Sequence, residues 1–240
     1  MLHSTREYQM SRNMNTRRSL YIICLLLLSA VGNKLDAQTV VKSVRQANDS
    51  TNHALIHQIG FDVRPGYVAP TNSFLEGDNA QRQKIDRSLS LHLKYAFQFS
   101  KDSYLGRLYP HAYQGIGVSH NTFYNSAELG NPVAVYAFQG APIVRLSSCL
   151  SLDYEWNFGA SFGWKQYDEH SNWYNDAIGS KINAYINLGF VLNWQFYPQW
   201  KLAAGVDFTH FSNGNTRYPN GGLNTCLLYT SPSPRDRTRS

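Results

Sequence analysis

A histidine and a serine lie two residues apart in the segment Phe208-Thr209-His210-Phe211-Ser212-Asn213. An imidazole beside a hydroxyl is the pair that a serine hydrolase requires, because the base must take the proton of the nucleophile. Side chains at positions i and i+2 of a β-strand share one face, so the two groups can meet if this segment is a strand. The segment therefore predicts Ser212 as a candidate nucleophile and His210 as its general base.

The face that carries this pair is otherwise apolar. The even positions of segment 202–212 are Leu202, Ala204, Val206 and Phe208, followed by His210 and Ser212. The neighbouring odd positions include Lys201, Asp207 and Thr209. A polar pair that faces lipid is costly unless it has a function. The pattern favours an enzyme that acts on membrane lipid, and it predicts that Asp207 points away from the pair.

Three long segments alternate strictly between apolar and polar residues and indicate β-strands. They are residues 88–100, 149–165 and 181–196, and the alternation in the last two extends over about 16 residues. Strands of soluble proteins usually have about 5–6 residues, which argues against a soluble β-sandwich, although that fold also alternates. Aromatic residues near the strand ends, and charged residues opposite a wholly apolar face, are typical of a transmembrane β-barrel.

Weaker strand patterns occupy residues 55–64, 109–122, 132–145 and 202–212, and a further strand would start near Leu223. Long polar connections (70–87 and 168–180) alternate with short ones (101–108 and 197–201). This arrangement predicts an all-β protein, an eight-stranded antiparallel transmembrane β-barrel with long outer loops and short periplasmic turns. His210 lies about 11 residues beyond a periplasmic turn, about 28 Å up a tilted strand, and hence near the outer-leaflet boundary.

The two ends of the chain differ from this body. Residues 1–37 resemble a signal peptide whose true start is Met10 or Met14, and its apolar run is too short to be a membrane-spanning helix. Residues 38–225 form the predicted barrel. Residues 226–240 contain Pro232, Pro234 and three Arg, which suit a lipid-facing closing strand badly. We therefore expect this tail to be foreign to the native chain, which would continue as a short eighth strand that is truncated or replaced here.

The net charge of +6 arises mainly at these ends. Residues 1–37 carry five Lys/Arg against two Asp/Glu, and residues 226–240 carry three Arg against one Asp, which leaves about +1 for the body. Charge therefore gives no support to nucleic-acid binding. Three histidines (His57, His111 and His120) lack metal-ligand spacing, so no metal or other cofactor is expected. Four charged or titratable residues (Lys94, His92, Asp153 and Glu155) are expected to form ion pairs that fill the lumen.

The motif His210-Phe211-Ser212-Asn213, followed by Pro219-Asn220-Gly221-Gly222-Leu223, resembles the outer-membrane lipid A 3-O-deacylases (PagL-like, also called acyloxyacyl hydrolases). The resemblance extends over most of residues 55–225. It implies an eight-stranded barrel in the Gram-negative outer membrane, with a metal-free Ser–His–Glu triad on its lipid-facing wall. It also implies lipid A of lipopolysaccharide as the substrate and Asn213 as a member of the oxyanion hole, and it leaves a homodimer open.

The chain departs from the family at the third triad member, because Asn224 stands where the family has Glu. An Asn can fix the imidazole tautomer, as it does in Cys–His–Asn proteases, but it cannot supply a negative charge. Three alternatives stay open: a lipid A esterase, a non-catalytic structural or adhesion barrel, and a small-solute pore. The pore is disfavoured because side chains just fill the interior of an eight-stranded barrel. The identity of the cleaved ester, 3-O or acyloxyacyl, is also left open.

Overall fold

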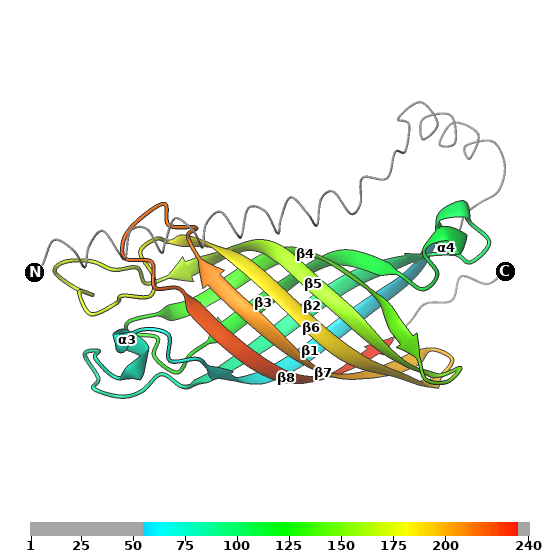
Figure 1. Ribbon diagram of the computed structural model, residues 1–240, viewed down its shortest axis with the longest axis horizontal. Helices are drawn as coiled ribbons and strands as arrows, with labels where there is room; N and C mark the ends of the chain where they lie inside the picture. The colour runs from blue at the N-terminus through cyan, green and yellow to red at the C-terminus, as the bar shows by residue number, and fades with distance from the viewer. Residues whose placement is uncertain (1–54, 235–240) are drawn as a thin grey trace, which may run out of the picture. The chain divides into compact units, whose positions relative to one another are not determined.

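A computed structural model describes residues 55–234 of the chain, so the expected signal peptide and the start of the predicted barrel lie outside the described residues. Eight strands and two short helices follow one another (Figure 1). They are β1 (Leu55–Val68), α3 (Ser73–Glu76), β2 (Arg87–Phe99), α4 (Tyr104–Leu108), β3 (Tyr113–Thr122), β4 (Gly130–Arg145), β5 (Leu150–Trp164), β6 (Ile182–Tyr197), β7 (Trp200–Ser212) and β8 (Leu223–Pro234).

Each strand pairs antiparallel with the next, and β8 pairs with β1 to close the ring. The predicted eight-stranded antiparallel barrel is confirmed. The strand expected over residues 109–122 starts only at Tyr113, because the chain first completes helix α4 and a turn with His111 at a positive φ of 65°. None of the helices in residues 55–234 has the length and apolar character needed to cross a membrane.

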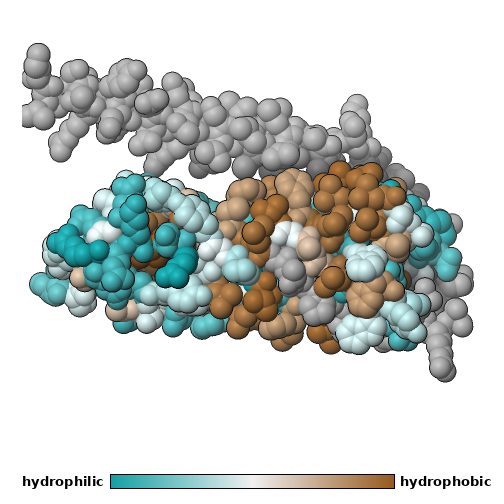
Figure 2. Space-filling model, turned by 90° about the horizontal axis from the view of Figure 1, so that it is seen from below, coloured by the Kyte–Doolittle hydropathy of each residue, from teal (hydrophilic) through white to brown (hydrophobic). Residues whose placement is uncertain are grey.

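The strands present apolar side chains outward and polar side chains inward, as alternation predicts. In β5, Glu155 and Asn157 are buried, whereas Trp156 and Phe158 between and beyond them are exposed. Figure 2 shows the outward side chains as a hydrophobic band between two more hydrophilic ends. Trp164 breaks the pattern and is buried, because Gly163 at φ 87° and a register shift in the β4–β5 pairing change the phase at the strand's end.

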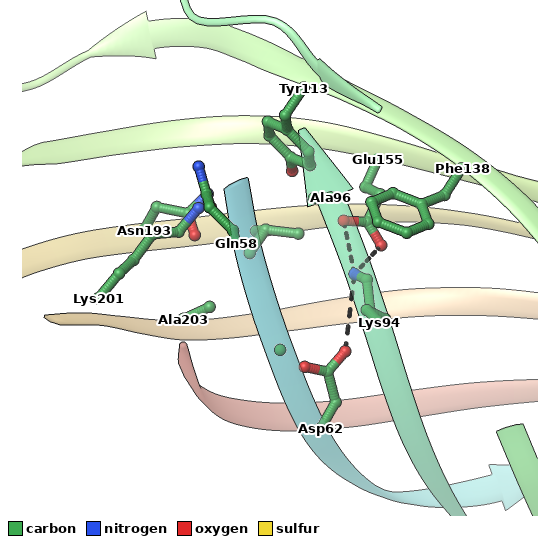
Figure 3. A pocket seen from close by; sticks show the side chains of 12 residues that line it. Gln58, Asp62, Lys94, Ala96, Tyr113, Phe138, Glu155, Asn193, Lys201 and Ala203 are labelled. Carbon is green, nitrogen blue, oxygen red and sulfur yellow. Dashed lines mark hydrogen bonds and ion pairs between the residues drawn. The ribbon is translucent and has the colours of Figure 1, made fainter. Parts of the chain in front are cut away.

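The lumen contains a network of buried charges. The guanidinium of Arg64 donates to Asp207 and to Asp62, each at 2.6 Å, and Lys94 Nζ donates to both carboxylate oxygens of Glu155 at 2.5 and 2.7 Å. Figure 3 shows Lys94 between Glu155 and Asp62 in the pocket at this level. A buried charge requires such partners, since an unpaired one is strongly destabilising. The expected lumenal ion pair of Lys94 and Glu155 is confirmed.

The other two residues expected to form lumenal ion pairs have neutral partners instead. Asp153 accepts from Asn193 Nδ2 and from Ser151 Oγ, both at 2.7 Å. His92 Nδ1 lies 2.8 Å from the hydroxyl of Tyr136. The ion-pair prediction was wrong for these two residues, because their hydrogen-bond partners are neutral groups: an amide and a hydroxyl for Asp153, and a phenol for His92, although Asp62 is the register partner of His92 on β1.

An apolar cluster fills the extracellular end of the barrel, where the helix α3 and the long loops meet. It brings together Val68, Phe74, Leu75, Ile85, Phe123, Leu129, Trp164, Ala177, Ile178, Phe211 and Leu223, all buried. We call this set the extracellular cluster. Asn72 caps α3 by accepting from the backbone N–H of Leu75 at 3.0 Å, which holds Phe74 and Leu75 over the lumen. A barrel closed by packed side chains is poorly suited to be a pore.

Strand β8 crosses residue 225, after which we expect the sequence to be foreign to the native chain. It pairs with β7 from Phe211–Leu223 to Trp200–Pro234, so residues 226–234 take part in the ring. Its pairing with β1 is shorter and covers Val63–Thr230, Gly66–Leu227, Tyr67–Cys226 and Val68–Thr225. Pairing in the ring does not test whether residues 226–240 are encoded by the native gene, so their foreign origin stays a prediction.

Candidate active site on the outer wall

Three polar side chains form a chain of hydrogen bonds on the outer wall of β7 and β8. His210 Nε2 lies 2.9 Å from Ser212 Oγ, and His210 Nδ1 lies 2.6 Å from Asn224 Oδ1. An amide oxygen can only accept, so Nδ1 carries the hydrogen and Nε2 is left to accept the proton of Ser212. The structure thus brings together the three residues that the sequence analysis proposed, in the tautomer that a serine nucleophile needs.

Strand register explains why Asn224 meets His210 although fourteen residues separate them. His210 and Asn224 are direct cross-strand partners in the β7–β8 pair. Side chains of such partners lie about 4.5–5.5 Å apart at Cβ, on the same face of the sheet. Ser212 follows His210 on that face by two residues, and its partner on β6 is Ala184, whose small side chain leaves the hydroxyl accessible.

The inward neighbours of the three residues hold them in place. Phe211, between His210 and Ser212, is 1% exposed, and Leu223, directly before Asn224, is 0% exposed. Both belong to the extracellular cluster, where the ring of Phe211 packs 5.1 Å from Trp164 between centroids. Because strand residues alternate in direction, burying Phe211 and Leu223 forces the polar side chains outward. The extracellular cluster thus closes the end of the barrel and also supports the site.

Gly222, which directly precedes β8, lies against the imidazole. A Cβ on Gly222 would lie 3.2 Å from His210 Cε1, and its φ of 70° favours glycine. Asn72 Nδ2 donates to the carbonyl of Gly222 at 3.2 Å, and the backbone N–H of Gly222 donates to Ala177 O at 3.0 Å. No role in the site was predicted for these residues from the sequence, although the Gly221-Gly222 pair indicates a close approach of the backbone to another group.

Asn213, the residue expected in the oxyanion hole, is engaged within the loop that follows β7. Its backbone N–H donates to Asn220 Oδ1 at 3.1 Å, and its amide nitrogen donates to the carbonyl of Arg217 at 2.7 Å. Its Oδ1 accepts from the backbone N–H of Asn215 at 2.9 Å. An amide group has two N–H hydrogens, so one of them is left for a substrate oxygen.

Within residues 55–234, His210 has Asn224 and Ser212 as its hydrogen-bond partners and no carboxylate in place of the missing Glu. Asp207 lies three residues before His210 but is 1% exposed and pairs with Arg64 in the lumen, as its strand phase predicts. Among residues 55–234 there is also no group of three or more His, Cys, Asp or Glu side chains arranged to hold a metal ion. The side chains joined by hydrogen bonds at His210 form a neutral Ser–His–Asn array.

Comparisons with known proteins concern the same stretch of chain. A family model described as "Lipid A 3-O-deacylase (PagL)" matches residues 83–231, which include His210, Ser212, Asn213 and Asn224. A search of curated proteins found no similar sequence.

Solved structures with a similar chain trace include three β-barrels. Neisserial surface protein A has a TM-score of 0.47 and 6% identity, with 75% of this chain and 98% of that chain covered. The outer membrane enzyme PagL has a TM-score of 0.43 and 13% identity, with 72% and 97% covered. Ail, the attachment invasion locus protein of Yersinia pestis, has a TM-score of 0.38 and 10% identity, with 76% and 99% covered.

Proposed function

Because the chain belongs to the lipid A 3-O-deacylase (PagL) family and forms a barrel of the Gram-negative outer membrane, we propose that it is a serine esterase. Its substrate would be lipid A in the outer leaflet, from which it would remove the acyl chain esterified at the 3 position. The observation that supports this proposal best is the hydrogen-bond chain Ser212–His210–Asn224 on the lipid-facing wall. A polar array in this position is costly for a barrel that has no use for it.

In the proposed reaction, Ser212 Oγ attacks the ester carbonyl carbon while His210 Nε2 takes the hydroxyl proton. The carbonyl oxygen becomes an oxyanion, which the second N–H of the Asn213 amide and a backbone N–H of the following turn would stabilise. Collapse of this intermediate breaks the bond to the sugar oxygen, and His210 returns its proton to that leaving oxygen. Water, activated by His210, then attacks the acyl-serine, releases the fatty acid and restores Ser212.

Asn224 would act on this reaction through His210. By accepting from Nδ1 it keeps Nε2 in the form that accepts a proton, which is the tautomer function of the third triad member. It lacks the charge that stabilises the imidazolium formed during attack. We therefore expect a working but slow esterase.

The alternative is a non-catalytic structural or adhesion barrel, and the neutral Asn224 is the observation that favours it. In that case Ser212 and His210 would be residues that merely open the loop after β7. The two functions differ in what happens to lipid A when Ser212 is removed.

The deciding experiment is mass spectrometry of lipid A from cells that carry the intact gene or Ser212→Ala. We expect the wild-type protein to remove one hydroxyacyl chain and Ser212→Ala to leave lipid A intact. Ser148→Ala, an exposed serine in the turn between β4 and β5, is the matched control and should behave as wild type. Identical spectra for wild type and Ser212→Ala, with both barrels present in the outer membrane, would favour the non-catalytic alternative.

A further inference from the structure

Two exposed cationic side chains flank the extracellular end of the strand that carries Ser212. Lys181 directly precedes β6, three residues before Ala184, which pairs with Ser212. At about 3.3 Å per residue, this places the backbone of Lys181 about 10 Å beyond that of Ala184, toward the outside. Arg217 lies in the loop between β7 and β8, five residues after Ser212.

The loops that carry these two cations pack against each other. A Cβ on Gly179 would lie 2.2 Å from the carbonyl oxygen of Pro219 and 3.0 Å from that of Arg217, so the backbones touch there. Lys181 is two residues from Gly179. The Arg217 carbonyl also accepts from the Asn213 amide at 2.7 Å, which ties this loop to the residue after Ser212. Backbone contacts therefore hold both positions beside the site.

Neither cation is neutralised by a carboxylate of residues 55–234. The loop between β5 and β6 contains three acidic residues, Asp168, Glu169 and Asp176. Asp176, the nearest of them to Lys181 in the sequence, is exposed, and its Oδ2 accepts from Ser73 Oγ at 3.3 Å. Arg82, another extracellular cation, differs in this respect, because it pairs with Asp78 at 2.9 Å. The rim beside Ser212 thus has two positive charges available for an anion.

The wall on the periplasmic side of the site is apolar. Ile186, the β6 partner of His210, is 44% exposed, and Phe208 is 57% exposed. A substrate with its ester at Ser212 would therefore meet an apolar surface toward the membrane core and positive charge toward the outside. Lipid A has this polarity, since its acyl chains extend from a phosphorylated sugar head group.

We propose that Lys181 and Arg217 form an anion subsite that holds a phosphate group of lipid A while the ester lies at Ser212. The inference rests on the proposed function, to which it adds the part of the substrate that is recognised. An arginine can bind phosphate through two parallel N–H donors, and a lysine adds a compact positive charge. The subsite would make the protein selective for phosphorylated lipid A over uncharged lipids with the same acyl chains.

The test measures binding in an inactive background, so that it does not depend on turnover. Ser212→Ala protein in detergent is titrated with lipid A and with fully dephosphorylated lipid A of the same acyl composition. Adding Lys181→Gln and Arg217→Gln should weaken binding of the phosphorylated lipid by at least about tenfold and leave the dephosphorylated lipid unaffected. Lys84→Gln, an exposed extracellular lysine in the loop between α3 and β2, is the matched control and should change neither.

An equal loss of affinity for both lipids, or no loss beyond that of Lys84→Gln, would overturn the subsite. The same three substitutions in the active protein separate this outcome from failure of the proposed function. If the subsite is absent but the protein is an esterase, the wild-type protein still releases fatty acid, and the glutamine variants release it at the same rate. If the protein is no esterase, fatty acid release is absent throughout, and the binding titration alone decides whether the anion subsite exists.

Discussion

Replacing Asn224 by Glu should convert the neutral array into a charged triad and accelerate the esterase. The carboxylate would lie where Asn224 Oδ1 now accepts from His210 Nδ1 at 2.6 Å. Two unit charges about 4 Å apart interact by about 4 kcal/mol at an effective dielectric constant of 20, and by about 1 kcal/mol in bulk water. Both side chains are half-buried, so we take about 1.5–3 kcal/mol of extra stabilisation for the imidazolium. This corresponds to about a 10–100-fold increase in kcat.

The assay is release of 3-hydroxy fatty acid from purified lipid A in detergent micelles at a fixed pH, with folding checked by the heat-dependent gel mobility of the barrel. Asn224→Gln is the matched control, because it has the length of Glu and no charge; it should be no faster than wild type. Equal rates for the Glu and Gln variants, or a Glu variant that folds but is slower than wild type, would refute the electrostatic argument.

Three further predictions concern the support of the site and the outer loops. Phe211→Ala should lower the free energy of unfolding by about 3–5 kcal/mol in a urea titration, because it opens a cavity in the extracellular cluster, while the lipid-facing Phe208→Ala should cost clearly less. Gly222→Ala should lower kcat with little effect on KM, since its φ of 70° strains an alanine by about 1–2 kcal/mol and its methyl group would press on His210; unchanged kinetics would contradict the positioning role. In the loop after β5, hydrogen bonds from Ser171 lower the pKa of the Asp168 carboxyl, so this contribution to stability is present at neutral pH and lost as the pH falls through the lowered pKa. Ser171→Ala should move the Asp168 titration, followed by NMR at its carboxyl carbon, back toward its ordinary range.

Much of the fold could be predicted because one face of each strand meets lipid and the other meets the lumen. Because of this difference, apolar and polar residues alternate along β2, β5 and β6, whereas they do not alternate in the loops. The same alternation places His210 outside and Asp207 inside, and both placements are confirmed. The register between neighbouring strands could not be predicted in this way, because alternation alone does not specify which residues of two strands lie opposite each other. Asn224 was therefore found through the family resemblance rather than through its spacing from His210.

The extracellular cluster could not be predicted from periodicity. Phe74, Leu75 and Ile178 come from loops or from the four-residue helix α3, where no repeating pattern marks a buried face. The nearness of Lys181 and Arg217 depends on how two loops pack at Gly179, which is again a tertiary contact. The neutral partners of Asp153 and His92 escaped prediction for a related reason, because charge content says nothing about which lumenal side chains lie opposite each other.

The short pairing between β1 and β8 affects which part of the β8 sequence can be exchanged without disturbing the site. The pairs lie toward the extracellular side, from Val63–Thr230 to Val68–Thr225. Asn224 directly precedes Thr225 in the chain, and its carbonyl accepts from the backbone N–H of Ala69 at 2.9 Å. Residues of β8 beyond Thr230 contact the ring through β7. Exchanging the far half of β8 between related barrels should therefore alter assembly and yield before it alters the geometry around His210.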